Sequence, residues 1–406
     1  MKISILLLIA VLSVSLVSDA GVQIFPIVDT IAKSYPDVPY TTVLLVSTLP
    51  FLATMITSFI FGFISGVKIG FKPVLIAGLF CLFIGGLAPA FLTSFGLILI
   101  ARTVFGIGLG LTISLNPYIV KVFAKDKKYN VSRVLGLSIT LMNIGSITMS
   151  ILSGSLGAVN WRYSFYIFFF LLVPIALVTL FLKEPERDTN TVTVAENATT
   201  DKKIRLTPLV ILYMFLAFMM GLVYVPIVTN ISAFIDQAGI GGPTQAGIAC
   251  SMAVAGGIFA GLIYTTMLKT GRYLISIMMA LEAIGAIIIL YGMNIYFVGA
   301  GMFLIGIGLY MSLSYFTDLS GQAAFNDASI MLSTSLIWVF NYAGAYFCTY
   351  WVKLIEHFVG TAEVVKASFM ATVFICATLA VIFIFINALP KTKKNEASLV
   401  SEGISN

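Results

Sequence analysis

Long apolar stretches separated by short polar ones run along the whole chain. A helix needs roughly 20 apolar residues to cross the hydrocarbon core of a bilayer, which is about 30 Å thick. Windows of that length predict twelve spans, which we expect to be helical because a lone backbone in lipid must satisfy its own hydrogen bonds. The predicted spans begin near Ile3, Tyr40, Pro73, Phe95, Ser132, Tyr163, Leu206, Thr244, Tyr273, Ile295, Ser329 and Thr361. The pattern therefore predicts an all-α membrane protein.

The composition agrees with lipid as the main solvent of the chain. Apolar residues make up 59% of the 406 residues and charged residues 10%, and the mean hydropathy is +1.05. An average soluble chain is roughly 45–50% apolar and about 25% charged, so a soluble particle of this size could not cover its surface with polar groups. The cysteines fall within predicted spans without metal-ligand spacing, and we expect no cofactor and no metal. They are Cys81, Cys250, Cys348 and Cys376.

The positive charges predict the orientation of the chain. With the N-terminus inside, most of the 23 Lys and Arg residues fall in inner loops, so we expect both termini in the cytoplasm and the spans in the plasma membrane. This bias explains the net charge of +6 without nucleic acid as a partner. Ser18-Asp19-Ala20 after an apolar run also resembles a signal-peptide cleavage site. Cleavage would invert every loop, so we expect the first span to be retained.

An internal repeat relates the two halves of the chain. At an offset of 200 residues, Pro26 matches Pro226, and Gly106-Ile107-Gly108-Leu109 matches Gly306-Ile307-Gly308-Leu309. Six crossings return the chain to its starting side, so equivalent spans run in the same direction. Such parallel repeats are typical of transporters whose halves rock about a site at the midplane. The predicted parts are a six-helix bundle at 1–182, a cytoplasmic linker at 183–205, a second bundle at 206–390 and a cytoplasmic tail at 391–406.

Ionisable residues inside spans are costly and are therefore functional candidates. Asp19 lies shortly before Pro26, where the first span is expected to end, and Arg102 lies as far after the start of the fourth span. Both would then lie about 10 Å below the outer end and could meet if the helices are adjacent. We expect Asp19 to be the protonation site and Arg102 to modulate it, with a static ion pair as the alternative. Glu282 and Asp318, also within spans, receive no assigned role.

Polar residues near the middle of the spans are the substrate-binding candidates. They are Gln23, Asn116, Asn143, Tyr224, Asn230, Trp338, Asn341 and Tyr342. They predict a mostly apolar cleft with scattered hydrogen-bonding groups, which favours a small organic molecule. The gating candidates lie at matched turns of the two halves and are Lys68, Gly70, Lys72, Lys269 and Arg272.

Several of these motifs resemble the major facilitator superfamily over essentially the whole chain. Arg102 followed by Gly106, Gly108 and Gly110 resembles the family's span-4 motif, in which the arginine is implicated in proton coupling. Asp19 followed by Pro26 is similar to the first span of bacterial proton-coupled drug and metabolite exporters, and this resemblance implies the plasma membrane of a bacterium as the location. The loop at 65–72 keeps the family's glycine and basic residues but lacks its aspartate, and the span-5 antiporter motif is only partly present.

These observations predict a secondary active transporter that works by alternating access and exports a small organic molecule in exchange for protons. The alternatives are uptake or exchange of an organic carboxylate at Arg102, lipid transport, and a receptor or scaffold that has lost transport. The chain has no P-loop and a single histidine, so we expect no ATP hydrolysis and no enzyme activity. The expected partners are the substrate, protons and membrane lipid, and the expected state is a monomer.

Overall fold

The described residues form a bundle of long helices. The computed structural model describes residues 5–65, 68–123, 129–185, 206–292, 294–324 and 327–388. Most of the predicted linker and the whole predicted tail lie outside these ranges, as does the side chain of Arg272. Ten helical segments are long and apolar enough to cross a bilayer, and α4 with its apolar stretch Leu45–Phe61 and the long helix α15 complete the twelve predicted spans.

Each predicted span corresponds to one or more helices. The first half contains α1 (Ile5–Ser15), η1 (Ala20–Ile27), α2 (Val28–Ser34), α3 (Tyr40–Val43), α4 (Leu45–Ile64), α5 (Phe71–Leu87), η2 (Ala88–Ala90), α6 (Phe95–Thr112), α7 (Leu115–Phe123), α8 (Val131–Val159), η3 (Trp161–Leu171) and α9 (Leu172–Phe181). The second half contains α11 (Pro208–Gln237), α12 (Pro243–Met267), η4 (Leu268–Tyr273), α13 (Leu274–Tyr291), α14 (Ile295–Gln322), α15 (Asp327–Val359) and α16 (Val364–Ala388). The all-α fold class is confirmed.

Polar capping residues set several of the helix starts. The Asn130 side chain accepts a hydrogen bond from the Arg133 backbone N–H at the start of α8, and Thr207 does the same for Val210 at the start of α11. Asn294 accepts from the first turn of α14. A side-chain oxygen at this position satisfies a backbone N–H that has no partner within the helix, so short polar loops are enough to separate the spans.

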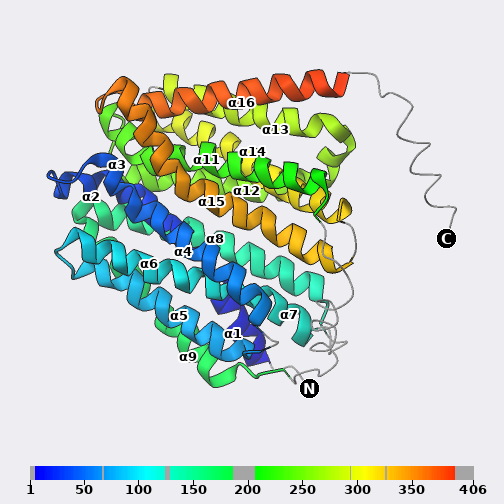
Figure 1. The fold of residues 1–406 in the computed structure, drawn as a ribbon. Coiled ribbons are helices and arrows are strands. Elements are labelled where there is room, and N and C mark those ends of the chain that lie inside the picture. The colour runs from blue at the N-terminus through cyan, green and yellow to red at the C-terminus, as the bar shows by residue number, and fades with distance from the viewer. Residues whose placement is uncertain are drawn as a thin grey trace.

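The two halves lie side by side as two groups of helices (Figure 1). Helix α8 of the first half packs against α12, and α4 packs against α15. The loop after α2 and the short helix α3 lie at one end of the bundle, which we call the α2 end. The start of α1 and the end of α16 lie at the opposite end (Figure 1). Large apolar side chains such as Leu262 and Phe374 are more than two thirds exposed, at 75% and 72%, as expected of a surface solvated by lipid.

The repeat places the same contacts in both halves. A Cβ atom on Gly108 would lie 2.8 Å from Leu82 Cγ, and one on Gly308 would lie 2.5 Å from Glu282 Cγ, at an offset of 200 in both residues. The two glycines therefore allow equivalent helix pairs, α5 with α6 and α13 with α14, to approach closely.

One expected boundary is wrong. The first span does not end near Pro26 but continues through η1 and α2 to Ser34. Pro26 lies within the 3₁₀ segment η1, and the chain resumes an α-helix at Val28. Because the span extends from Ile5 to Ser34, Asp19 lies at its middle and not near its end, as the sequence analysis had expected. The first span is also packed into the bundle, because α1 contacts α8 and α9.

Candidate functional site

The first span is broken at its middle. Helix α1 ends at Ser15 and η1 begins at Ala20, and Asp19 between them has the non-helical angles φ −118° and ψ 33°. The backbone hydrogen bonds across the break are of the three-residue kind, such as Ser18 N–H to Ser15 O at 3.2 Å. Discontinuous helices of this kind form substrate and ion sites in many transporters, because the break frees polar groups at the midplane.

Helix α8 lies directly over this break. A Cβ atom on Gly145 would overlap the backbone carbonyl of Leu16, so only glycine allows this approach. Polar side chains of α1 and η1 face α8 at intervals of four residues and pair with serines. The pairs are Ser15 with Ser138 at 2.6 Å, Asp19 with Ser146 at 3.0 Å, and Gln23 with Ser153 at 3.2 Å. We call these six residues the polar ladder.

Asp19 is the only carboxylate of the polar ladder. Its Oδ2 accepts a hydrogen bond from the Ser146 hydroxyl, and the residue is half-buried although it lies at the middle of the span. Among the described residues no lysine or arginine lies within ion-pair distance of it. A carboxylate with one neutral donor and no cation in this setting is costly to keep charged, which makes it suited to binding a proton.

Three tyrosines of the second half lie near Asp19. Tyr224 of α11, Tyr310 of α14 and Tyr342 of α15 each interact electrostatically with its carboxylate. All three are half-buried, as is Asp19. Tyr342 also stacks on Phe51 of α4, with ring centroids 6.1 Å apart and planes at 14°. The site is therefore shared by both halves.

Other predicted substrate residues surround this region. Trp338 lies beside Tyr342, with ring centroids 6.4 Å apart, and is 40% exposed. The Asn341 side chain donates to the carbonyl of Ala217 at 3.2 Å and links α15 to α11. Asn143 is buried on α8 between the levels of Ser138 and Ser146. Gln23 is buried as well, and its Nε2 has no hydrogen-bond partner.

Arg102 lies outside this site. Its Nε donates to the carbonyl of Val46 at 2.9 Å, and the guanidinium carbon lies 4.3 Å from the centre of the Phe105 ring. A Cβ atom on Gly21 would contact Leu109, and α6 runs antiparallel to the first span, so Asp19 lies about 13 Å from Arg102 along the membrane normal. The expected equal depth of the two residues is wrong, and they do not form an ion pair in this structure, because the first span extends beyond Pro26.

Two further candidates lie away from the centre. Asn230 is fully buried and accepts a hydrogen bond from the Tyr40 hydroxyl at 2.8 Å, so it joins the two halves toward the α2 end. Asn116 is exposed on the short helix α7, beyond α6, and the structure does not bring it to Asp19.

The predicted gating residues of the first half bind within their own half. Gly70 makes room for the Glu184 carboxylate, which accepts from the backbone N–H groups of Phe71 and Lys72 at 2.7 Å each. The Lys72 ammonium donates to the carbonyl of Thr179 at 2.8 Å. These contacts cap the start of α5 and tie it to the end of α9. Lys68 and Lys269 are exposed.

Contacts between the halves cluster at the α2 end. The Lys33 ammonium lies 2.6 Å from Asp236 of α11 and 2.9 Å from Asp29 of its own helix. Thr41 donates to Glu356 at 3.1 Å, and Thr48 and Thr349 share a hydrogen bond of 2.6 Å. We call these contacts, with the Tyr40–Asn230 bond, the α2-end closure. The sequence analysis missed them, although Lys33 and Asp236 lie near the ends of equivalent spans.

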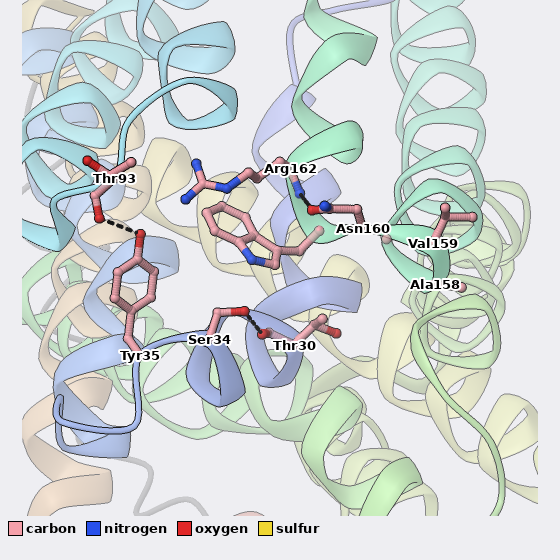
Figure 2. Close-up of a pocket in the computed structure, with 10 residues that line it drawn as sticks. Thr30, Ser34, Tyr35, Thr93, Ala158, Val159, Asn160 and Arg162 are labelled. Atoms are coloured by element: carbon pink, nitrogen blue, oxygen red, sulfur yellow. Dashed lines mark hydrogen bonds between the residues drawn. The ribbon is translucent and has the colours of Figure 1, made fainter.

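A surface pocket of about 540 Å³ lies at the same end, beside α2 (Figure 2). Its wall is made by the first half alone, and it includes Tyr35, whose hydroxyl donates to the carbonyl of Thr93 at 2.9 Å. The Arg162 guanidinium donates to the carbonyl of Leu92 at 2.6 Å and lies 4.5 Å from the centre of the Trp161 ring. Arg162 therefore holds the loop before α6, and the pocket lies apart from Asp19.

The sequence model of the Major Facilitator Superfamily matches residues 3–331. The chain belongs to this family. Among solved structures, the nucleoside transporter NupG superimposes with a TM-score of 0.76 at 11% identity, covering 94% of this chain and 99% of that one. The xylose transporter XylE from E. coli gives a TM-score of 0.69 at 14% identity, covering 96% and 97%. A peptide transporter, POT, gives 0.72 at 12% identity, covering 94% of each chain. A search of curated protein sequences finds no match.

Membership of the Major Facilitator Superfamily confirms the resemblance found in the sequence. The solved structures are only 11% and 14% identical to this chain, so their similarity shows the fold alone. The protein is thus a multi-pass membrane protein with a transporter fold. Among the described residues, no group of three His, Cys, Asp or Glu side chains could hold a metal ion.

Proposed function

We propose that this protein moves a small organic molecule across the membrane by alternating access, coupled to proton binding at Asp19. The observation that carries the proposal is the place of Asp19. Its carboxylate lies at a helix break at the middle of the first span, bonds only to Ser146 among the described residues, and lies near tyrosines of the other half. An ionisable group at this depth is a functional residue by default.

Movement of the halves links the proton to transport. Asp19 belongs to the first half and Tyr310 and Tyr342 to the second, so rocking changes the surroundings of the carboxylate. The free energy of keeping its charge then differs between the two states, and protonation shifts their populations by that difference. In the structure, the α2-end closure joins the halves on one side, which corresponds to one of the two states.

The surroundings of Asp19 favour an organic molecule with a ring or alkyl group and several hydrogen-bonding groups. Phe51, Trp338 and Tyr342 offer aromatic faces, and the tyrosine hydroxyls offer donors and acceptors. The similar solved structures are transporters of nucleosides, peptides and xylose, which have this general chemistry. The exporter-like pairing of Asp19 with Pro26 favours export in exchange for protons.

A second candidate function is uptake or exchange of an organic carboxylate at Arg102. It is favoured by one observation, since Nη1 of Arg102 is buried without a hydrogen-bond partner. A carboxylate would satisfy that nitrogen. However, Arg102 has no exposed surface and is enclosed by Val46 and Phe105, so a substrate would reach it only after the α2 end opens.

Reconstitution tests the first proposal. Thermal-shift screening of nucleosides, sugars, dipeptides and drugs would identify a ligand, whose flux is then measured in liposomes with and without a pH gradient. Asp19→Asn should lose transport driven by the gradient but retain exchange of ligand across the membrane. Ser146→Ala is the matched control, because it removes the hydrogen bond and keeps the carboxylate, and it should retain gradient-driven transport. Uphill transport by Asp19→Asn would refute the assignment.

A further inference from the structure

A second carboxyl group is buried within the second half. Glu282 of α13 is 1% exposed and lies in the contact between α13 and α14, against Gly308. Its Oε2 accepts a hydrogen bond from the Cys376 thiol of α16 at 3.6 Å, and its Oε1 has no hydrogen-bond partner. A thiol is a weak donor, so most of the hydrogen-bonding capacity of this carboxyl is unused.

The repeat shows that packing does not require a carboxyl here. The equivalent residue in the first half is Leu82, which packs against Gly108 as Glu282 packs against Gly308. Leucine therefore fills the same space between equivalent helices without a polar group. An unpaired carboxyl in place of an apolar side chain costs free energy, and its presence at this position calls for a function other than packing.

The groups around Glu282 determine its charge. Among the described residues, no cation lies within ion-pair distance of it. Among the described residues, the titratable groups that interact with it are Cys376 of α16 and Tyr224 of α11, and Gly308 of α14 lies against it. Lys269 of the neighbouring η4 is thirteen residues away along the chain, about 20 Å at the rise of an α-helix. A carboxylate in these surroundings is costly to keep charged, so the site favours binding of a proton.

We propose that Glu282 is a second proton-binding site, enclosed by α13, α14 and α16. The Glu282 carboxylate and one proton from the aqueous phase form the carboxylic acid, and the reverse step returns that proton. Proton binding by Glu282 does not rest on the proposed function.

Infrared difference spectroscopy during a pH titration tests the proposal, and the proton itself is the probe. Protonated carboxylic acids have a carbonyl-stretch band that disappears on deprotonation. For wild-type protein in lipid we expect two titrating components of this band. Glu282→Gln should lose one, and Asp19→Asn should lose the other.

The controls separate proton binding from folding. Glu282→Leu introduces the residue that the first half uses at this position and should fold with undiminished thermal stability while lacking the same component as Glu282→Gln. A band that is absent from Glu282→Gln but independent of pH in wild type would show a permanently protonated packing residue and overturn the inference. An unchanged titrating band in Glu282→Gln would overturn it as well. If Asp19→Asn lost a titrating component and Glu282→Gln lost none, the result would support the proposed function and refute proton binding by Glu282.

Discussion

The two halves of the protein share their packing and differ in their polar centres. In each half, a glycine of the fifth span contacts the backbone of the first, Gly145 with Leu16 and Gly344 with Phe218. Yet the first span of one half is broken at its middle, whereas α11, its counterpart, runs unbroken from Pro208 to Gln237. The same arrangement of helices thus accepts a broken or a continuous span.

The comparison identifies what causes the break. Both spans contain a proline at the equivalent place, Pro26 and Pro226, and α11 remains helical through its proline. At the offset of 200 residues that pairs the prolines, the polar residues Ser18 and Asp19 correspond to the apolar residues Phe218 and Met219. Serine and aspartate bond to nearby backbone groups in competition with the helix, and the Ser18 hydroxyl donates to the carbonyl of Val14 at 2.9 Å. The polar residues, more than the proline, therefore specify the site.

The largest effect is expected when Asp19 is replaced by methionine, the residue at the equivalent position 219 of the second half. Asp19→Met should abolish gradient-driven transport and also exchange, because it removes the carboxylate and favours a continuous helix through the break. Asp19→Asn removes the charge but keeps a polar side chain and should lose only the coupling. Ligand flux and exchange in liposomes measure the two losses separately. Equal behaviour of the two variants would show that the break has no role of its own.

The converse exchange concerns the carboxyl of the second half. Leu82→Glu places an acid at the equivalent position of the first half, where Ala176 and Ile24 replace the thiol of Cys376 and the hydroxyl of Tyr224. We expect it to destabilise the protein by at least about 1–3 kcal/mol, the cost of a buried unsatisfied polar group. Glu282→Leu should not lower stability. Thermal unfolding in detergent measures both, and equal losses would contradict the distinction between the halves.

The glycines should respond equally in the two halves, because both use them for packing. Gly106→Ala and Gly306→Ala each place a Cβ atom against a neighbouring backbone carbonyl, that of Pro50 and that of Ala253. Overpacking of this kind costs about 1–3 kcal/mol, and thermal unfolding should show similar losses. Gly136→Ala is the matched control, since nothing lies within 4 Å of a Cβ atom there, and its stability should not fall.

Much of the fold could be predicted from the sequence. The helices at Tyr40, Phe95 and Ile295 begin at the predicted residues, since length and hydropathy alone determine where a chain enters lipid. Asp19 was found because a charge in an apolar span is rare. Its depth was misjudged because Pro26 was interpreted as the end of the span, whereas a 3₁₀ segment accommodates the proline. Ser146, which binds Asp19, carries no signal in the sequence, since its role arises only when α8 packs over the break.

The smallest expected effect concerns the α2-end closure. Lys33 and Asp236 form an ion pair between the halves, but their side chains are 56% and 45% exposed. An exposed pair contributes roughly 0.2–1 kcal/mol, so Asp236→Ala should raise the population that is open at this end by up to about fivefold. Spin labels at Ser94 of the first half and Tyr296 of the second would report it as a longer distance.

Asp29→Ala is the matched control, because Asp29 binds the same ammonium, at 2.9 Å, from within the first half. Its loss removes an ion pair of similar length without removing a contact between the halves, and the distance distribution should stay as in wild type. The exchange of charges in Lys33→Asp with Asp236→Lys should restore the closed population, since the attraction between the halves is then regained. If Asp29→Ala opened this end as much as Asp236→Ala, the ion pair between the halves would have no specific role. The α2-end closure would then depend on the hydrogen bonds of Tyr40, Thr41 and Thr48.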